Sequence, residues 1–284
     1  MKPTELIDKI VKQGKLKDRS IGALTKWIVE NQGKETVREY LSAINEDEVL
    51  TLTPEGKQQG KIVFRRLSHS PFFNGLAIRY SEREWFKESE QIFKAIITRT
   101  PNYVDSILNY GATILNMTLA LYDQGKGINK DRLERGRSII FKAYRYDRKV
   151  HEDWRTKPAY KNLCYLRAIE AVYYYTQKEF FTSFVLGWLS IEMSLYRIWF
   201  QFVTNKTTMK IRELMRWDSD HIIETLFLGG VDEDYKIIKN RLDILRGIRN
   251  RLLHGEIDNP TLGNVKLCID TALKLVPILQ SQQT

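Results

Sequence analysis

Four polar side chains near the C-terminal end of the chain have the types and spacing to handle a phosphodiester. Arg246, Asn250 and His254 recur at spacings of four residues, and Arg249 lies beside Asn250. Residues four apart share one face of a helix, so the pattern predicts a single helical edge that carries these side chains together. Beside it, leucine and isoleucine recur at spacings of three and four residues and predict a buried apolar stripe: Leu242, Leu245, Ile248 and Leu252. The next residue, Gly255, is the type that most often ends a helix in the left-handed conformation.

These residue types match the needs of RNA cleavage by the ribose 2′-hydroxyl. The reaction requires a base for the hydroxyl proton, an acid for the departing 5′-oxygen and a cation for the phosphate. Histidine titrates near neutral pH and can be either the base or the acid. Arginine stays charged and presents a planar fork to phosphate oxygens. We therefore expect His254 to be the general acid or base, Arg249 to hold the phosphate and Asn250 to orient one of them.

One chain supplies only one histidine to this edge. Arg249 and His254 are five residues apart, which is about 140° around an ideal helix. The two side chains converge if Arg249 bends back along the helix. Otherwise a second chain must supply the histidine that faces Arg249. A two-fold dimer that joins two such edges would place two histidines and two arginines in one cleft. Arg246 and Arg251 would then be auxiliary contacts to RNA phosphates.

The same residues also fit a purely structural role. In that alternative the arginines form a solvated basic face, and His254 caps the helix and interacts favourably with its dipole.

The complete pattern resembles the signature of a known family. Residues 242–255 read L-D-I-L-R-G-I-R-N-R-L-L-H-G, and Arg249-Asn250-x-x-x-His254 within them is similar to the R-N-x-x-x-H motif of HEPN domains. HEPN domains are all-helical and occur in RNA-cleaving toxins, anti-phage effectors and RNA-processing proteins. The resemblance covers roughly residues 160–284 and leaves the first part of the chain unassigned.

The resemblance implies a metal-independent endoribonuclease whose site is completed by a homodimer and which needs no cofactor. It implies a toxin or anti-phage defence effector that cuts RNA and has an antitoxin or a trigger-sensing protein as a further partner. The non-enzymatic alternative is a HEPN-like module that dimerises and binds RNA or nucleotides without cutting.

Composition points to a polyanionic partner and a reducing compartment. The 284 residues carry a formal net charge of +10 and a pI of about 9.4, which favours RNA as the partner. Cys164 and Cys268 lie in apolar helical patterns and are expected to be buried thiols. Scattered histidines and distant cysteines lack zinc-ligand spacing, so no metal is expected. Without an uncharged apolar run of about 18 residues or a signal peptide, we expect a cytoplasmic protein with no membrane partner.

Hydrophobic periodicity predicts a mainly α protein in three parts. Residues 1–82 are expected to form a small α+β module, residues 83–158 a helical, basic connecting region, and residues 159–284 a helical bundle, which the resemblance implies is HEPN-like.

The expected α+β module has short helices in residues 1–45, followed by β-like runs. Residues 49–53 and 61–64 flank a turn signal, and residues 76–80 are expected to be a further strand. Three helices followed by a hairpin resemble a winged-helix module. A DNA-binding regulator is therefore a third functional class, and a cap with no role in nucleic-acid binding is its structural alternative.

Residues 129–161 are the most basic part of the chain. Arg145, Arg148 and Lys149 lie there, interleaved with Tyr144, Tyr146 and Trp154. Cations bind phosphates and aromatic faces stack on unpaired bases, so this region is the predicted RNA-binding surface outside the catalytic edge. A solvated helix face, partly balanced by acidic residues, is the alternative.

Residues 180–204 predict a long, mostly apolar helix, either the central core helix or a dimer helix, that carries one notable carboxylate. Glu192 is expected to support the Arg/His edge. Its alternative is a structural carboxylate paired with Arg197 or Arg246.

Overall fold

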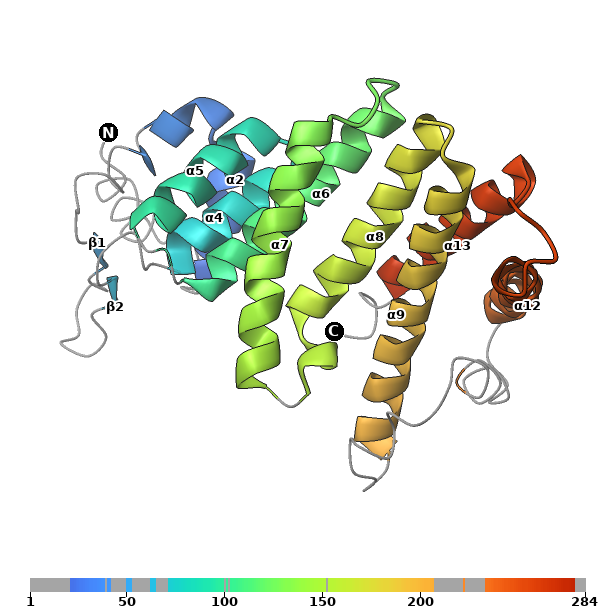
Figure 1. Ribbon diagram of the computed structural model, residues 1–284. Coiled ribbons are helices and arrows are strands. Elements are labelled where there is room, and N and C mark those ends of the chain that lie inside the picture. Colours follow the sequence, from blue (N-terminus) through green and yellow to red (C-terminus); the bar gives the residue numbers. More distant parts are fainter. Residues whose placement is uncertain are drawn as a thin grey trace. The chain divides into compact units, whose positions relative to one another are not determined.

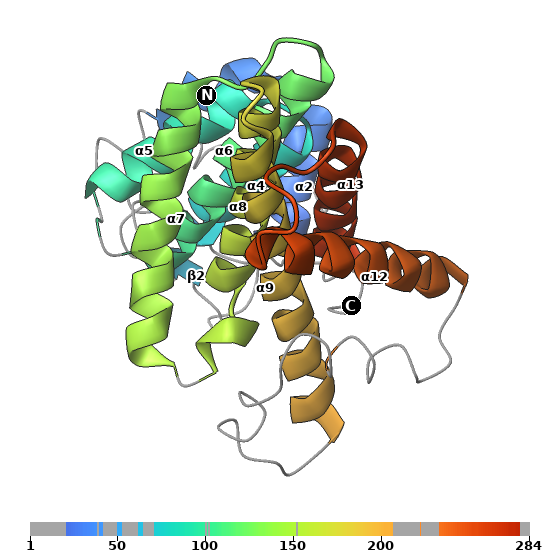
Figure 2. The same cartoon turned by 45° about the vertical axis from the view of Figure 1, so that its right-hand side comes forward.

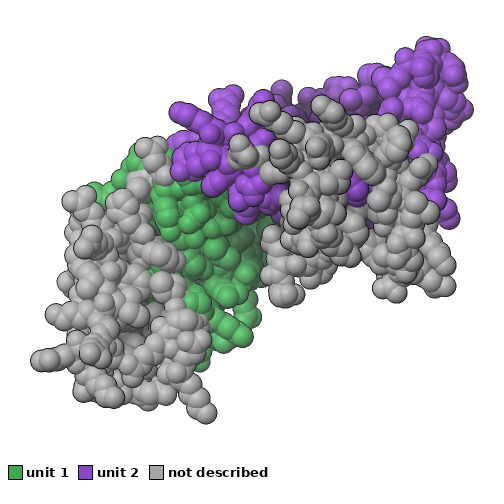
Figure 3. All heavy atoms as spheres, turned by 90° about the horizontal axis from the view of Figure 1, so that it is seen from below, with its two compact units in different colours: residues 1–117 green, residues 118–284 purple. Residues whose placement is uncertain are grey.

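The described part of the chain is mainly helical, as the sequence predicted (Figure 1). The computed structural model describes residues 21–38, 40–41, 50–52, 62–64, 71–99, 101, 103–151, 153–206, 222 and 233–278. The chain divides into two compact units, residues 1–117 and 118–284, which Figure 3 colours separately. The domain boundaries predicted after residues 82 and 158 stay predictions.

Unit 1 is built mainly around helix α4. Its elements are α2 (Ile21–Asn31), η1 (Lys34–Thr36), β1 (Leu50–Leu52), β2 (Ile62–Phe64), α4 (Pro71–Glu82), α5 (Phe86–Arg99) and most of α6 (Val104–Asp123). Helix α4 packs against α2 and α5, and the Ser89 hydroxyl on α5 donates a 2.7 Å hydrogen bond to the Ala77 carbonyl on α4.

The strand expected at residues 76–80 is wrong, because this segment lies inside α4. Phe72, Phe73, Leu76, Ala77 and Tyr80 are all fully buried, and their spacing of mainly three and four residues follows a helical period. Residues 76–80 taken alone are compatible with a strand. Together with the buried Phe72 and Phe73 they show the helical period.

The structure does not support the predicted α+β module in residues 1–82. Within the described ranges, its β content is the antiparallel pairing of β1 with β2, three residues each, in the register Leu50 to Phe64. The turn signal expected between residues 53 and 61 lies outside the described residues, as does the helical stretch expected before residue 21.

Unit 2 holds the predicted HEPN-like region. It contains the end of α6 and, in order, α7 (Lys130–Val150), η3 (Trp154–Thr156), α8 (Pro158–Thr176), α9 (Phe180–Lys206), α12 (Glu233–Leu253) and α13 (Leu262–Ile278). Helices α8 and α9 run antiparallel, α13 packs against both, and α12 crosses α9 (Figures 1 and 2). The predicted core helix is thus α9.

Small residues on α9 allow its close packing against α8 and α13. The hydroxyls of Ser183 and Ser190 donate 2.7 Å hydrogen bonds to backbone carbonyls of α8. A Cβ atom on Gly187 would lie 2.9 Å from the Cys268 sulfur of α13. Both predicted buried cysteines are confirmed, since Cys164 and Cys268 are free and fully buried.

Unit 2 contains two buried charged side chains, one with hydrogen-bond partners and one without them among the described residues. Glu170 has no exposed surface and accepts hydrogen bonds from Arg137 at 2.7 Å and Arg167 at 2.6 Å, which ties α7 to α8. Arg197 on α9 also has no exposed surface, but its guanidinium nitrogens have no hydrogen-bond partner in the part of the chain that the structure describes. An uncompensated buried charge is costly and calls for a functional explanation.

Among the described helices, none has the length and apolar character needed to cross a membrane.

The close contact at Gly187 gives a stability prediction with a matched control. Gly187→Ala should lower the free energy of unfolding by roughly 1–3 kcal/mol, because the new methyl group overpacks the Cys268 contact. Gly247→Ala on α12, where no atom lies within 4 Å of the added Cβ, should raise it by up to about 1 kcal/mol. Urea denaturation measures both variants, and equal stability of the two would contradict the close packing of α9.

Candidate functional site

Helix α12 presents the predicted Arg/Asn edge by burying its neighbouring stripe. Leu242 and Leu245 are fully buried and Ile248 is 3% exposed, as their spacing predicted. The helix ends at Leu253, and Gly255 has φ +69°. The Gly255 and Glu256 amides donate to the carbonyls of residues 252 and 251, which is a Schellman ending. The predicted role of Gly255 is confirmed.

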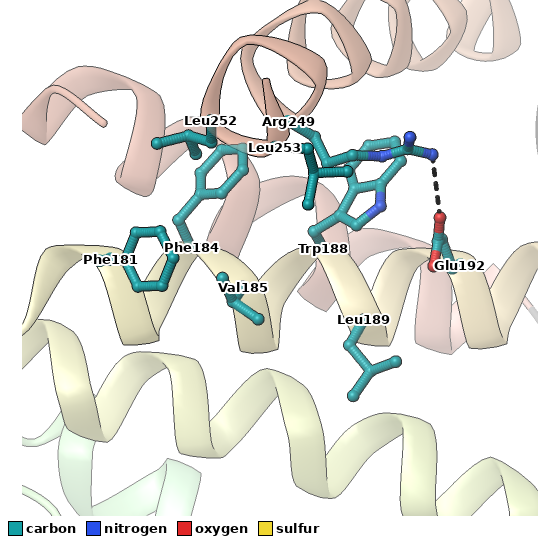
Figure 4. Close-up of a pocket in the computed structure, with 9 residues that line it drawn as sticks. All are labelled: Phe181, Phe184, Val185, Trp188, Leu189, Glu192, Arg249, Leu252 and Leu253. Carbon is teal, nitrogen blue, oxygen red and sulfur yellow. Dashed lines mark hydrogen bonds and ion pairs between the residues drawn. The ribbon is translucent and has the colours of Figure 1, made fainter. Parts of the chain in front are cut away.

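Arg249 is held in a defined position by three neighbours. One terminal nitrogen donates a 2.8 Å hydrogen bond to the Asn250 side-chain oxygen, and the other lies 3.3 Å from the Glu192 carboxylate. The guanidinium also lies 5.3 Å from the centre of the Trp188 ring (Figure 4). Glu192 thus pairs with Arg249 rather than with Arg197 or Arg246, and α9 contributes directly to the edge on α12.

The Arg249–Glu192 pair lies in a pocket of about 440 Å³ whose other lining is apolar. The pocket is formed by α9 and the last turn of α12, with Trp188 beneath Arg249 (Figure 4). Several apolar side chains around it are exposed to solvent in the single chain: Phe181 by 48%, Val185 by 45%, Leu189 by 37% and Leu253 by 71%. We call these four residues the apolar stripe.

His254 lies just beyond the helix and is exposed. Its backbone amide donates to the Asn250 carbonyl at 2.9 Å. Within the described part of one chain, no hydrogen bond joins its imidazole to Arg249, Asn250 or Glu192. The structure therefore brings Arg249, Asn250 and Glu192 together and leaves His254 outside this group.

The predicted auxiliary cations lie on two different helices of unit 2. Arg246 is 3.5 Å from Asp243 on the same helix, and Arg251 is exposed. On α7, the side chains of Arg145, Arg148 and Lys149 are all exposed. The Arg148 guanidinium lies 5.8 Å from the centre of the Trp154 ring.

A second pocket adjoins the first along α9. It measures about 310 Å³, and Leu189 and Glu192 line both pockets. Arg155 of η3, Tyr160 of α8, and Tyr196 and Phe200 of α9 line the remainder with Met193. The Arg155 guanidinium lies 4.1 Å from the centre of the Trp154 ring and 5.6 Å from that of Phe200, so its position is fixed by aromatic faces.

The region around the second pocket carries an excess of positive charge. Burial, and then the charge of Arg197, lower the pKa of Lys161 to about 8. Burial likewise lowers the pKa of Arg197 itself. Burial raises the pKa of the Cys164 thiol to about 12, so this thiol is protonated at neutral pH and does not compensate Arg197.

The sequence did not predict that the Trp188 ring lies beneath Arg249, or that the apolar stripe is exposed to solvent. The apolar pattern of residues 180–204 does not distinguish Trp188 from Val185. Trp188 is 5% exposed, and its ring also supports Arg249, whereas Val185 faces solvent. The spacing of Phe181, Val185 and Leu189 places them on one helical face, but no sequence signal marks that face as lacking a partner.

The Arg249–Glu192 pair should contribute little to stability, because its side chains are 26% and 28% exposed. A double-mutant cycle with Arg249→Met and Glu192→Gln, followed by thermal denaturation, should give a coupling of at most about 1 kcal/mol. The control is Arg137→Met, which should cost more than Arg249→Met because it removes a partner from the fully buried Glu170. A coupling of several kcal/mol would instead mark the Arg249 pair as structural.

In the described ranges, no cluster of three or more His, Cys, Asp and Glu side chains is placed to hold a metal ion. Comparison of the chain with protein-family models, with curated proteins and with solved structures found no match, so the geometry of the site carries the functional argument.

Proposed function

We propose that the chain is a metal-independent endoribonuclease of the HEPN type that cleaves RNA at a site completed by a homodimer. The observation that carries the proposal is the position of Arg249. Glu192, Asn250 and Trp188 hold it at a pocket, five residues before an exposed histidine. A fixed, partly exposed guanidinium is suited to binding the phosphate in phosphodiester cleavage, and a second copy of the chain would bring a histidine to it.

Each residue has a distinct role in the proposed reaction. His254 exchanges the proton of the 2′-hydroxyl or of the departing 5′-oxygen. Arg249 binds the phosphate and neutralises the charge that accumulates in the transition state. Asn250 and Glu192 orient the guanidinium, and Arg246 and Arg251 contact neighbouring phosphates.

The apolar stripe supports the homodimer. Phe181, Val185 and Leu189 form a solvent-exposed row on α9, and Leu253 extends it beside Arg249. A contiguous exposed apolar surface of this kind marks an interaction site. Packing the stripes of two copies about a two-fold axis would bring both Arg249–His254 edges to the same cleft, which supplies the second histidine that the chemistry needs.

The wider charge distribution agrees with a nucleic-acid substrate. The net charge is +10, and Arg145, Arg148 and Lys149 are exposed at the C-terminal end of α7 in the same unit as the site. Such cations bind the RNA backbone without reading its sequence. A toxin or anti-phage effector controlled by an antitoxin or a trigger-sensing protein, acting in the cytoplasm, is the biology that the HEPN resemblance implies.

The second candidate is a non-catalytic module that dimerises through the same stripe and only binds RNA. It is favoured by the exposure of His254, whose imidazole makes no hydrogen bond to the described residues of one chain. Under this alternative the His254 side chain is dispensable.

The test is cleavage of labelled bulk tRNA in excess EDTA by wild type, His254→Ala and His151→Ala. His254→Ala should lower the cleavage rate by about 10²-fold or more, because a general acid or base contributes that much. The products should carry 2′,3′-cyclic phosphate ends. His151→Ala is the control for loss of a histidine outside the proposed catalytic edge; it lies at the RNA-binding end of α7 and should lower the cleavage rate far less than His254→Ala does.

Equal cleavage by wild type and His254→Ala would remove His254 from the reaction. Absence of cleavage by all three proteins, together with retained dimerisation and RNA binding, would favour the non-catalytic module.

A further inference from the structure

The second pocket continues the groove that begins at Arg249. Leu189 and Glu192 are common to both pockets, and Tyr196 and Phe200 carry the wall further along α9. Its volume of about 310 Å³ lies at the lower end of the range for small-molecule pockets. A ligand of that size extending from the Arg249 phosphate is one nucleotide of the bound strand.

The walls of this pocket have the chemistry of a nucleobase site. Tyr160, Tyr196 and Phe200 line the pocket, and the Arg155 guanidinium lies 4.1 Å from the centre of the Trp154 ring and 5.6 Å from that of Phe200. Tyrosine and phenylalanine rings and guanidinium planes are the surfaces on which proteins stack unpaired RNA bases. Tyr196 is the partly exposed ring and therefore the expected stacking face.

The charge around the pocket favours an attached phosphate. Arg155 lines the pocket, and Arg197 and Lys161 lie close enough for the charge of Arg197 to act on both Lys161 and Tyr160. Arg197 is fully buried, and its guanidinium makes no hydrogen bond within the described residues. A phosphate bound nearby would offset this buried positive charge, which no described carboxylate offsets through an ion pair.

Among the described residues that line the pocket, Glu192 is the only carboxylate. One of its oxygens accepts from Arg249, and the second makes no hydrogen bond to the described residues. A carboxylate accepts hydrogen bonds and donates none. Guanine is the RNA base whose Watson–Crick edge presents two adjacent N–H donors, so a carboxylate at this position selects guanine over adenine.

We propose that the pocket formed by Arg155, Tyr160, Glu192, Tyr196 and Phe200 binds one unpaired guanine of an RNA strand, beside the phosphate held by Arg249. The inference rests on the proposed function to the extent that RNA is the ligand. The exposed Arg148 lies over Trp154, which also contacts Arg155. The strand therefore leaves the pocket toward the basic end of α7.

The test uses fluorescein-labelled 2′-O-methyl hexamers, U-U-G-U-U-U and U-U-A-U-U-U, with binding followed by fluorescence anisotropy. These oligonucleotides lack the attacking hydroxyl, so their binding is measured separately from cleavage. Wild type should bind the guanine hexamer about tenfold more tightly than the adenine hexamer. Glu192→Gln should make the two affinities equal, because an amide replaces an acceptor with a donor on one side.

The stacking ring is tested with a matched tyrosine. Tyr196→Leu should weaken binding of the guanine hexamer by about tenfold, the lower part of the range for loss of one stacked base. Tyr173→Leu on α8, outside the pocket, should bind like wild type. Circular dichroism checks that each variant is folded. If Tyr196→Leu unfolds, the ratio of the guanine-hexamer to adenine-hexamer affinities of Glu192→Gln tests the proposal instead.

Equal binding of both hexamers by wild type, or equal losses in Tyr196→Leu and Tyr173→Leu, would overturn the guanine pocket. Guanine-selective binding by a protein that cleaves no RNA would leave the pocket in place and remove the proposed catalysis. RNA cleavage by a protein that binds both hexamers equally would support the proposed catalysis and overturn the guanine pocket.

Discussion

The burial of one face of α9 is the constraint on which unit 2 depends. Ser183, Gly187 and Ser190 let this helix approach α8 and α13 closely, and Ile191 and Leu195 are fully buried. Because that face is fixed, the remaining faces of α9 have a fixed direction as well. The helix therefore carries the core, the Arg249 partner and the walls of both pockets at once.

The electrostatics of the groove follow from this arrangement. Glu192 lies where the two pockets meet and attracts Arg249, while Arg155 is fixed by aromatic rings at the far end. A guanidinium that is held in place before the substrate arrives needs little reorganisation when charge develops on a phosphate. Because the Arg249–Glu192 pair is partly exposed, we expect it to orient the guanidinium and to contribute little to stability.

The sequence was sufficient for the local features of the site and insufficient for its tertiary ones. Periodicity predicted the buried stripe of α12, and residue type predicted the left-handed Gly255, since both depend on near neighbours in the chain. The pairing of Glu192 with Arg249 joins residues 57 apart, and no spacing rule specifies it. The strand expected at residues 76–80 failed for a similar reason, because a short apolar run is compatible with either a strand or a helix until its packing partners are known.

The most direct test of the central claim links self-association to cleavage through Val185, which is 45% exposed on the apolar stripe. Val185→Asp should convert a dimer to a monomer in analytical ultracentrifugation and abolish RNA cleavage in the same preparation, because the charge would be buried without a partner in the interface. Ile237→Asp, at a similarly exposed position on α12 (52%), should leave both properties intact. A monomeric Val185→Asp that cleaves RNA at the wild-type rate would contradict a site completed by two copies of the chain.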